Sequence, residues 1–236
     1  MTRLVAYVLS LVLSSVAVAE PSAAAETPRP LVVFAAASLK EAVTELTNEW
    51  SRKTARPVAL SFDATSTMAR QIKAGAPADV FLVAAPEWLD EVKPLARLDW
   101  LSNRLVCVVP NDVASFDIHT ADSLVLANEQ VPAGKYARAA LAYLGVALPP
   151  RVVYGASVRD VLSKVVAGAA PAGIVYATDA AVEPAVRIAF TFPADSHQKI
   201  VYAAGLLTAE GTALFEALRE PWALTIARRY GFVNFE

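Results

Sequence analysis

Leu31-Val32-Val33-Phe34, followed at once by Ala35-Ala36-Ala37-Ser38, is the stretch that decides the fold. The first four residues leave no polar face, which is typical of a central parallel strand covered on both sides. Beyond this stretch, apolar residues recur at helical spacing at Leu39, Ala42, Val43, Leu46 and Trp50. A buried strand that leads directly into an amphipathic helix predicts an α/β fold.

The same alternation continues along the chain. Further strands are predicted at residues 58–62, 78–83, 104–109, 123–127, 152–154, 173–176 and 200–204. Helical patterns lie at residues 68–75, 88–92, 132–144, 157–166 and 212–230. Repeated strand-helix units predict two lobes, each a mostly parallel sheet flanked by helices. We expect two crossing segments to join the lobes, near residues 105–110 and 198–206.

The N-terminus has the pattern of an export signal. Residues 1–19 hold one charge, Arg3, then an apolar run that ends in Ala17-Val18-Ala19, a small-residue cleavage site. The alternative, a membrane-spanning helix, needs about 20 apolar residues, and this run is shorter. We therefore expect a cleaved signal peptide at 1–19, a disordered leader at 20–29, one lobe from 30–108 plus 203–236, and the other from 109–202. The mature protein is predicted to be periplasmic.

Composition narrows the classes of partner. A net charge of −2 gives no basic surface for nucleic acid. The single cysteine, Cys107, allows no internal disulfide, and it lies in an apolar run and far from the signal, so it predicts a core residue rather than a lipid anchor. We expect a monomer.

Four strand-to-helix junctions have the character of an anion site. They are Ser38 with Glu41, the hydroxyl-rich run 63–67, Val131-Pro132-Ala133-Gly134, and Ser157-Val158-Arg159-Asp160. Each helix start offers unpaired N–H donors and a partial positive charge. The alternative is that Ser38 and the other hydroxyls only cap their helices. Two such junctions in each lobe favour an anion held between the lobes.

Tyr176 ends a predicted strand at the same edge, so its hydroxyl could face the cleft while its ring packs, although such a tyrosine can equally be a core residue. The cations Lys40, Arg70, Lys135 and Arg159 follow the junctions and either raise the local potential or are simply solvated.

A secreted hydrolase is the alternative from another class. The two histidines, His119 and His197, lie at no nucleophile elbow or zinc spacing, and no phosphate-cradling glycine loop occurs. The sequence therefore predicts a binding protein rather than an enzyme.

The sequence also resembles a known family. Phe34-Ala35-Ala36-Ala37-Ser38-Leu39, Ala74-Gly75-Ala76-Pro77-Ala78-Asp79-Val80-Phe81 and Gly173-Ile174-Val175-Tyr176 are similar to the periplasmic molybdate-binding proteins of ABC transporters, as are 69–72, 131–137, 158–159, 192–193 and 229–232. The resemblance covers nearly the whole chain in order. It implies the two-lobed fold of the type II periplasmic binding proteins, with a tetrahedral oxyanion held by neutral donors.

The resemblance implies five ligand-binding residues: Ser38, Thr65, Ala133, Val158 and Tyr176. Thr65 stands where the family usually has serine, so Ser66 is an alternative source of that hydroxyl. Asp63 replaces a small residue, and Asn128-Glu129 replaces a segment that often reads Gly-Asp-Pro. A carboxylate in the pocket would repel a dianion, so we expect Asp63 to point away.

The implied ligand is molybdate or tungstate, which the sequence does not separate, and the implied partner is the membrane permease of an ABC transporter. No cofactor is expected besides this ligand. A pocket with donors only disfavours hydrogen phosphate, whose proton would lack an acceptor, whereas sulfate can be excluded only by size. Receptors for sulfate, phosphate or another oxyanion remain the alternatives within the same architecture.

Overall fold

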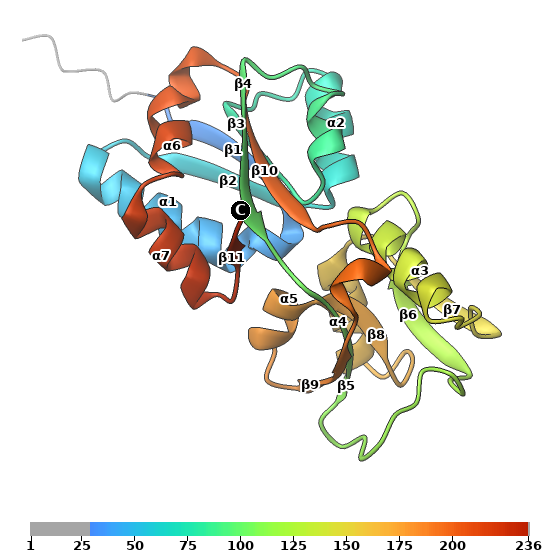
Figure 1. The fold of residues 1–236 in the computed structure, drawn as a ribbon. Coiled ribbons are helices and arrows are strands. Elements are labelled where there is room, and N and C mark those ends of the chain that lie inside the picture. Colours follow the sequence, from blue (N-terminus) through green and yellow to red (C-terminus); the bar gives the residue numbers. More distant parts are fainter. Residues whose placement is uncertain (1–28, 236) are drawn as a thin grey trace, which may run out of the picture.

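The computed structural model describes residues 29–235 as two lobes, each built on one sheet (Figure 1). The first sheet has the order β11-β4-β10-β3-β1-β2 and the second β7-β6-β8-β5-β9. The predicted signal peptide and residues 20–28 of the predicted leader lie outside the described residues. Arg29, the last residue of that leader, is held in place, because its guanidinium donates to both carboxylate oxygens of Asp79 at 2.7 and 2.8 Å.

The first lobe gathers both ends of the described chain. Its strands are β1 (Leu31–Ala36), β2 (Val58–Asp63), β3 (Val80–Val83), β4 (Ala96–Ser102), β10 (Val201–Leu206) and β11 (Val233–Asn234). Its α-helices are α1 (Lys40–Thr54), α2 (Thr65–Lys73), α6 (Thr212–Ala217) and α7 (Pro221–Arg229). Short 3-10 helices lie at η1 (Ala37–Leu39), η2 (Pro86–Leu89) and η4 (Ala209–Gly211).

The second lobe is formed by the middle of the chain. Its strands are β5 (Leu105–Pro110), β6 (Ser123–Ala127), β7 (Arg151–Gly155), β8 (Gly173–Tyr176) and β9 (Val186–Thr191). Its helices are α3 (Pro132–Tyr143), α4 (Val158–Val166) and α5 (Ala177–Ala181), with the 3-10 helix η3 (Ala194–Ser196).

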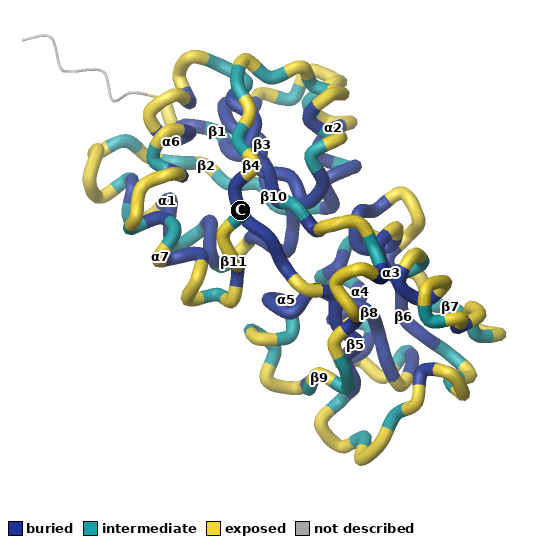
Figure 2. The backbone as a smooth tube through the Cα atoms, in the orientation of Figure 1, coloured by how far each residue is buried: buried dark blue, intermediate teal, exposed yellow. Residues whose placement is uncertain are grey.

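The apolar patterns explain which elements lie at the centre. In β1, five of the six residues are buried, since the strand pairs with β2 on one side and β3 on the other. Helix α1 buries the stripe predicted from the sequence and leaves its other face to solvent. Figure 2 shows the same division, with buried strands in the middle of each lobe and exposed outer helix faces. The predicted two-lobed α/β fold is confirmed.

The sheets are mixed rather than mostly parallel, which corrects one detail of the prediction. In the first sheet β1 pairs in parallel with β2 and β3, whereas the pairings of β10 and β11 are antiparallel. In the second sheet β5 is antiparallel to β8 and β9. For β5 and β10 the reason is the crossing between lobes, because each of these strands arrives from the other lobe and enters against the direction of its neighbours.

The crossing segments also begin earlier than predicted. Residues 105–110 form β5 within the second sheet, so the first crossing lies between Ser102 and Leu105, and the boundary expected at 108 comes too late. The second crossing lies between β9 and β10, and β10 already belongs to the first sheet. The Ser102 hydroxyl donates to the Ile200 carbonyl at 2.7 Å, so the two crossings are bonded to each other.

Cys107 lies in the core of β5 and is fully buried. Burial raises the pKa of its thiol to about 12, because the thiolate would lack solvation there. The side chain therefore behaves as a small apolar group, in line with the predicted core position.

Candidate functional site

The five predicted ligand-binding residues surround one small cavity between the lobes. Its lining consists of Ala36, Ala37, Ser38, Ala64, Thr65, Ala84, Val131, Pro132, Ala133, Ser157, Val158 and Tyr176. The volume of the cavity, taken as the space open to the centre of a water-sized sphere, is about 20 Å³. Since roughly 10 to 15 Å³ by this measure holds one water, the space suits a single small ion and excludes a sugar or peptide.

Ser38 lies in η1, directly after the carboxyl end of β1, and its exposed fraction is 3%. Its Oγ accepts a hydrogen bond from the Tyr202 hydroxyl at 3.0 Å. The alternative role as a helix cap is not observed, because α1 begins at Lys40 without a side-chain cap. Glu41, which was named with Ser38 at the first junction, instead pairs with Arg159.

Thr65 is the first residue of α2 and is 1% exposed. Its Oγ1 accepts from the backbone N–H of Ala84 at 3.1 Å, which leaves its own hydrogen available to the cavity. Ser66, the alternative source of this hydroxyl, lines a larger groove outside the cavity. Asp63 is absent from the cavity lining, and its Oδ1 accepts from the Ala64 N–H at 2.6 Å.

The second lobe presents two helix N-termini. Helix α3 begins at Pro132, so Ala133 provides the first N–H of this helix. Helix α4 begins at Val158, and the Ser157 hydroxyl before it accepts from the Asp160 N–H at 3.2 Å. The first N–H groups of a helix have no acceptor within it, and the helix dipole adds partial positive charge, so both ends suit an anion.

Tyr176 ends β8, and its hydroxyl has no hydrogen-bond partner within residues 29–235 although the side chain is 1% exposed. An unpaired buried hydroxyl costs stability unless something occupies the cavity beside it. Burial, with the nearby oxygens of Tyr202, Tyr136 and Asp179, raises the pKa of this phenol well above its usual value. It therefore keeps its proton and can donate it to a ligand.

The four predicted cations do not line the cavity. Arg159 Nε lies 2.6 Å from Asp179 Oδ1, and its terminal nitrogen pairs with Glu41 of the first lobe. Lys135 Nζ lies 3.8 Å from a carboxylate oxygen of Glu87, also across the lobes. Lys40 is exposed, and Arg70 lines the outer groove. The cavity lining itself holds no charged side chain, so its positive character comes from N–H and O–H dipoles.

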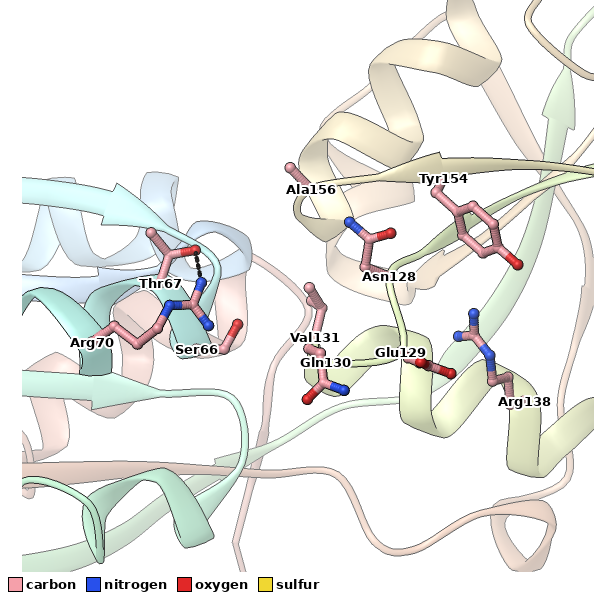
Figure 3. Close-up of a pocket in the computed structure, with 10 residues that line it drawn as sticks. All are labelled: Ser66, Thr67, Arg70, Asn128, Glu129, Gln130, Val131, Arg138, Tyr154 and Ala156. Carbon is pink, nitrogen blue, oxygen red and sulfur yellow. Dashed lines mark hydrogen bonds between the residues drawn. The ribbon is translucent and has the colours of Figure 1, made fainter.

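The outer groove, of about 550 Å³, adjoins the cavity, because Val131 lines both. Figure 3 shows Ser66, Thr67 and Arg70 on the side of the first lobe, facing a wall from the second lobe that contains Asn128 and Tyr154. Arg70 donates to the Thr67 hydroxyl at 3.3 Å. The groove therefore lies beside the cavity and is lined by polar residues of both lobes.

Sequence reasoning missed three residues that support this site: Asn103, Tyr202 and Asp179. Tyr202 lies in the apolar run of β10 and has the pattern of a core residue. Asp179 is fully buried beside Arg159, and burial raises the pKa of its carboxyl to about 6. Asn103 lies between β4 and β5 and is buried. The one signal in the sequence that could have found it is a polar amide directly before an apolar strand.

The two histidines, His119 and His197, which were the candidate groups for a hydrolase, are not part of the cavity. Within the described part of the chain no group of three His, Cys, Asp or Glu side chains could hold a metal ion. Among residues 29–235, no helix combines the length and apolar character needed to cross a bilayer.

Comparison with known proteins gives one consistent result. The chain is 37% identical to the molybdate-binding protein ModA of Escherichia coli strain K12, covering 86% of this chain and 88% of that protein. It is similar in structure to the substrate-binding domain of a putative molybdenum ABC transporter from Clostridium difficile, with 27% identity, a TM-score of 0.68 and coverage of 88% and 99%.

The periplasmic molybdate-binding protein of Azotobacter vinelandii has the same fold, with a TM-score of 0.74, 23% identity and coverage of 87% and 100%. The predicted resemblance is therefore confirmed. These relatives are substrate-binding proteins, and residues 31–233 match the family described as bacterial extracellular solute-binding proteins. On this match, and on the identity to ModA over most of both chains, the chain belongs to the bacterial extracellular solute-binding proteins.

Proposed function

We propose that this chain captures molybdate or tungstate between its lobes outside the inner membrane and delivers the ion to the permease of an ABC transporter. The observation that carries the proposal is the cavity itself, which holds Ser38, Thr65, Ala133, Val158 and Tyr176 in a lining without charged side chains. The names of the relatives give the ligand class.

The proposed binding mode follows from the donor set. Molybdate near neutral pH carries no proton, so its four oxygens only accept hydrogen bonds. The Ser38 and Thr65 hydroxyls already accept from Tyr202 and Ala84, so each has its hydrogen left for an oxyanion. The Tyr176 phenol and the N–H groups of Ala133 and Val158 complete the set from the second lobe.

Because each lobe holds part of the donor set, the ligand favours the closed arrangement of the lobes. The closed form is the one we propose to dock on the permease. The site then binds its ligand without turnover, and no cofactor takes part. Export through the signal at residues 1–19 belongs to the same proposal, and N-terminal sequencing of the protein purified from the periplasm tests it.

Calorimetric titration of the protein with molybdate, tungstate, sulfate and phosphate tests the proposal. Thr65→Val keeps the shape of the side chain and removes its hydroxyl, so molybdate affinity should fall about 10-fold. Thr67→Val is the matched control, because Thr67 lies on the same helix but lines only the outer groove. Wild-type protein that binds neither molybdate nor tungstate would refute the proposed function.

A further inference from the structure

A chain of hydrogen bonds runs from the crossing between the lobes to Ser38. Asn103 lies between β4 and β5, and Tyr202 lies near the start of β10 after the second crossing. The Asn103 amide nitrogen lies 3.2 Å from the Tyr202 hydroxyl, which lies 3.0 Å from Ser38 Oγ. Asn103, Tyr202 and Ser38 are all buried.

The direction of each bond is set by chemistry. The Arg104 backbone N–H can only donate, and it lies 2.8 Å from Asn103 Oδ1, which fixes which end of the amide is the oxygen. The NH₂ end therefore faces the hydroxyls of Thr178, at 2.8 Å, and Tyr202. An amide NH₂ only donates, so the Tyr202 oxygen accepts from it.

The remaining steps follow in order. Since Tyr202 accepts from Asn103, its own hydrogen goes to Ser38 Oγ. Burial raises the pKa of Tyr202, so this phenol keeps the hydrogen. Ser38 then accepts from inside the protein, and its hydrogen points to the cavity that it lines. The same logic holds for Thr65, which accepts from the Ala84 N–H, a group that can only donate.

We propose that Tyr202 and Asn103 are specificity-determining positioning residues, which fix Ser38 as a donor and thereby reject oxyanions that carry a proton. The inference rests on the proposed function and names the residues behind its selectivity. A protonated oxygen such as that of hydrogen phosphate needs an acceptor, and a serine hydroxyl free to rotate would provide one. The chain of bonds removes this freedom, because it occupies one lone pair of Ser38 Oγ and turns its hydrogen to the cavity, so a bound O–H group meets a donor instead of an acceptor.

The ring of Tyr202 is held independently of its hydroxyl. It makes edge contacts with Tyr176 at 6.0 Å and with Phe232 at 5.2 Å between ring centroids. Tyr202→Phe therefore keeps the packing and removes only the hydroxyl, with its bonds to Ser38 and Asn103. Tyr136→Phe is the matched control, because Tyr136 packs against Tyr176 in the same cluster but does not line the cavity.

The decisive experiment compares sulfate with inorganic phosphate, which are similar in size but differ in carrying a proton near neutral pH. Calorimetry, or displacement of molybdate where binding is weak, gives both affinities. In Tyr202→Phe the ratio of sulfate to phosphate affinity should fall about 10-fold, whereas Tyr136→Phe should keep the wild-type ratio. Asn103→Ala should shift the ratio in the same direction by a smaller factor, and thermal unfolding confirms that each variant is folded.

An unchanged ratio of sulfate to phosphate affinity in folded Tyr202→Phe would overturn the inference. This holds whether or not molybdate affinity falls, because a structural defect weakens the binding of both ions alike. Failure of the proposed function has a different signature, which is wild-type protein that does not bind molybdate or tungstate.

Discussion

Arg159 of α4 and Glu41 of α1 form an ion pair that joins the two lobes beside the cavity. The same guanidinium pairs with Asp179, so one cation is shared between a fully buried and a partly exposed carboxylate. Arg159 follows Val158 directly, and Glu41 lies one helical turn beyond Ser38. The pair therefore links the two walls of the site in the closed arrangement.

Glu41→Gln should weaken closure more than it weakens folding. The Glu41 and Arg159 side chains are 33% and 22% exposed, so the pair contributes under about 1 kcal/mol to the free energy of unfolding. Molybdate affinity should fall about 3-fold, because the closed form loses a contact that the open form lacks. Glu45→Gln is the control on the same helix, since Glu45 pairs with Arg229 within the first lobe. Equal affinity losses in both variants, measured by calorimetry, would contradict a role in closure.

Asp179 should make the protein less stable as the pH rises from 4 to 6. Burial raises the pKa of this carboxyl to about 6, above its value in the unfolded chain. Between pH 4 and pH 6 the Asp179 carboxyl is already ionised in the unfolded chain but still holds its proton in the folded protein. The free energy of unfolding therefore falls over this range, by about 2 kcal/mol. Urea unfolding at several pH values should show this decline in the wild type relative to Asp179→Asn. Parallel curves would mean that Arg159 fully offsets the effect of burial.

Tyr176→Phe should change stability and affinity in opposite directions. Without ligand, the variant removes a buried hydroxyl that has no partner among the described residues, so the free energy of unfolding should stay equal or rise by about 1 kcal/mol. Molybdate affinity should fall about 10-fold through loss of one donor. Urea unfolding and calorimetry give the two quantities. A clear loss of stability in the ligand-free protein would show that the hydroxyl already has a partner.

Gly134→Ala should displace the Ala133 donor. A Cβ at Gly134 would lie 2.1 Å from the Asn128 carbonyl oxygen and 2.5 Å from that of Ala127, so the start of α3 must move. Stability should fall by about 2 kcal/mol and molybdate affinity should fall with it. Gly145→Ala, just beyond the same helix, is strained by its φ of +67° but far from the site. It should lose stability and keep affinity, and a Gly134 variant with normal affinity would contradict the role of Ala133.

The fold was predictable wherever the apolar pattern was continuous. Strands β6 and β8 have the predicted bounds, and α3 begins at the predicted Pro132. Strand β4 was missed because Arg97 and Asp99 interrupt its apolar residues, although their alternation with Leu98 and Trp100 is typical of a strand with one solvent face. Strand β9, at the edge of the second sheet, was missed for a similar reason.

The helix starts that line the cavity were predictable, because the hydroxyls, the proline and the N-cap are local signals. The contacts that orient these groups were not. Ser38 and Tyr202 are 164 residues apart in the sequence, and Arg159 and Glu41 are 118 apart. Such long-range contacts form only once both sheets are packed, so no local pattern in the sequence predicts them.

The small size and buried walls of the cavity have a consequence for kinetics. A guest ion beside side chains as buried as Thr65 and Tyr176 is held by walls from both lobes, so it leaves most readily when the lobes part. Its residence time is then set by how often the lobes part, a property of the protein, and not by the strength of any one contact. Since parting separates the Arg159–Glu41 pair, which is partly exposed, added salt should shorten that residence time.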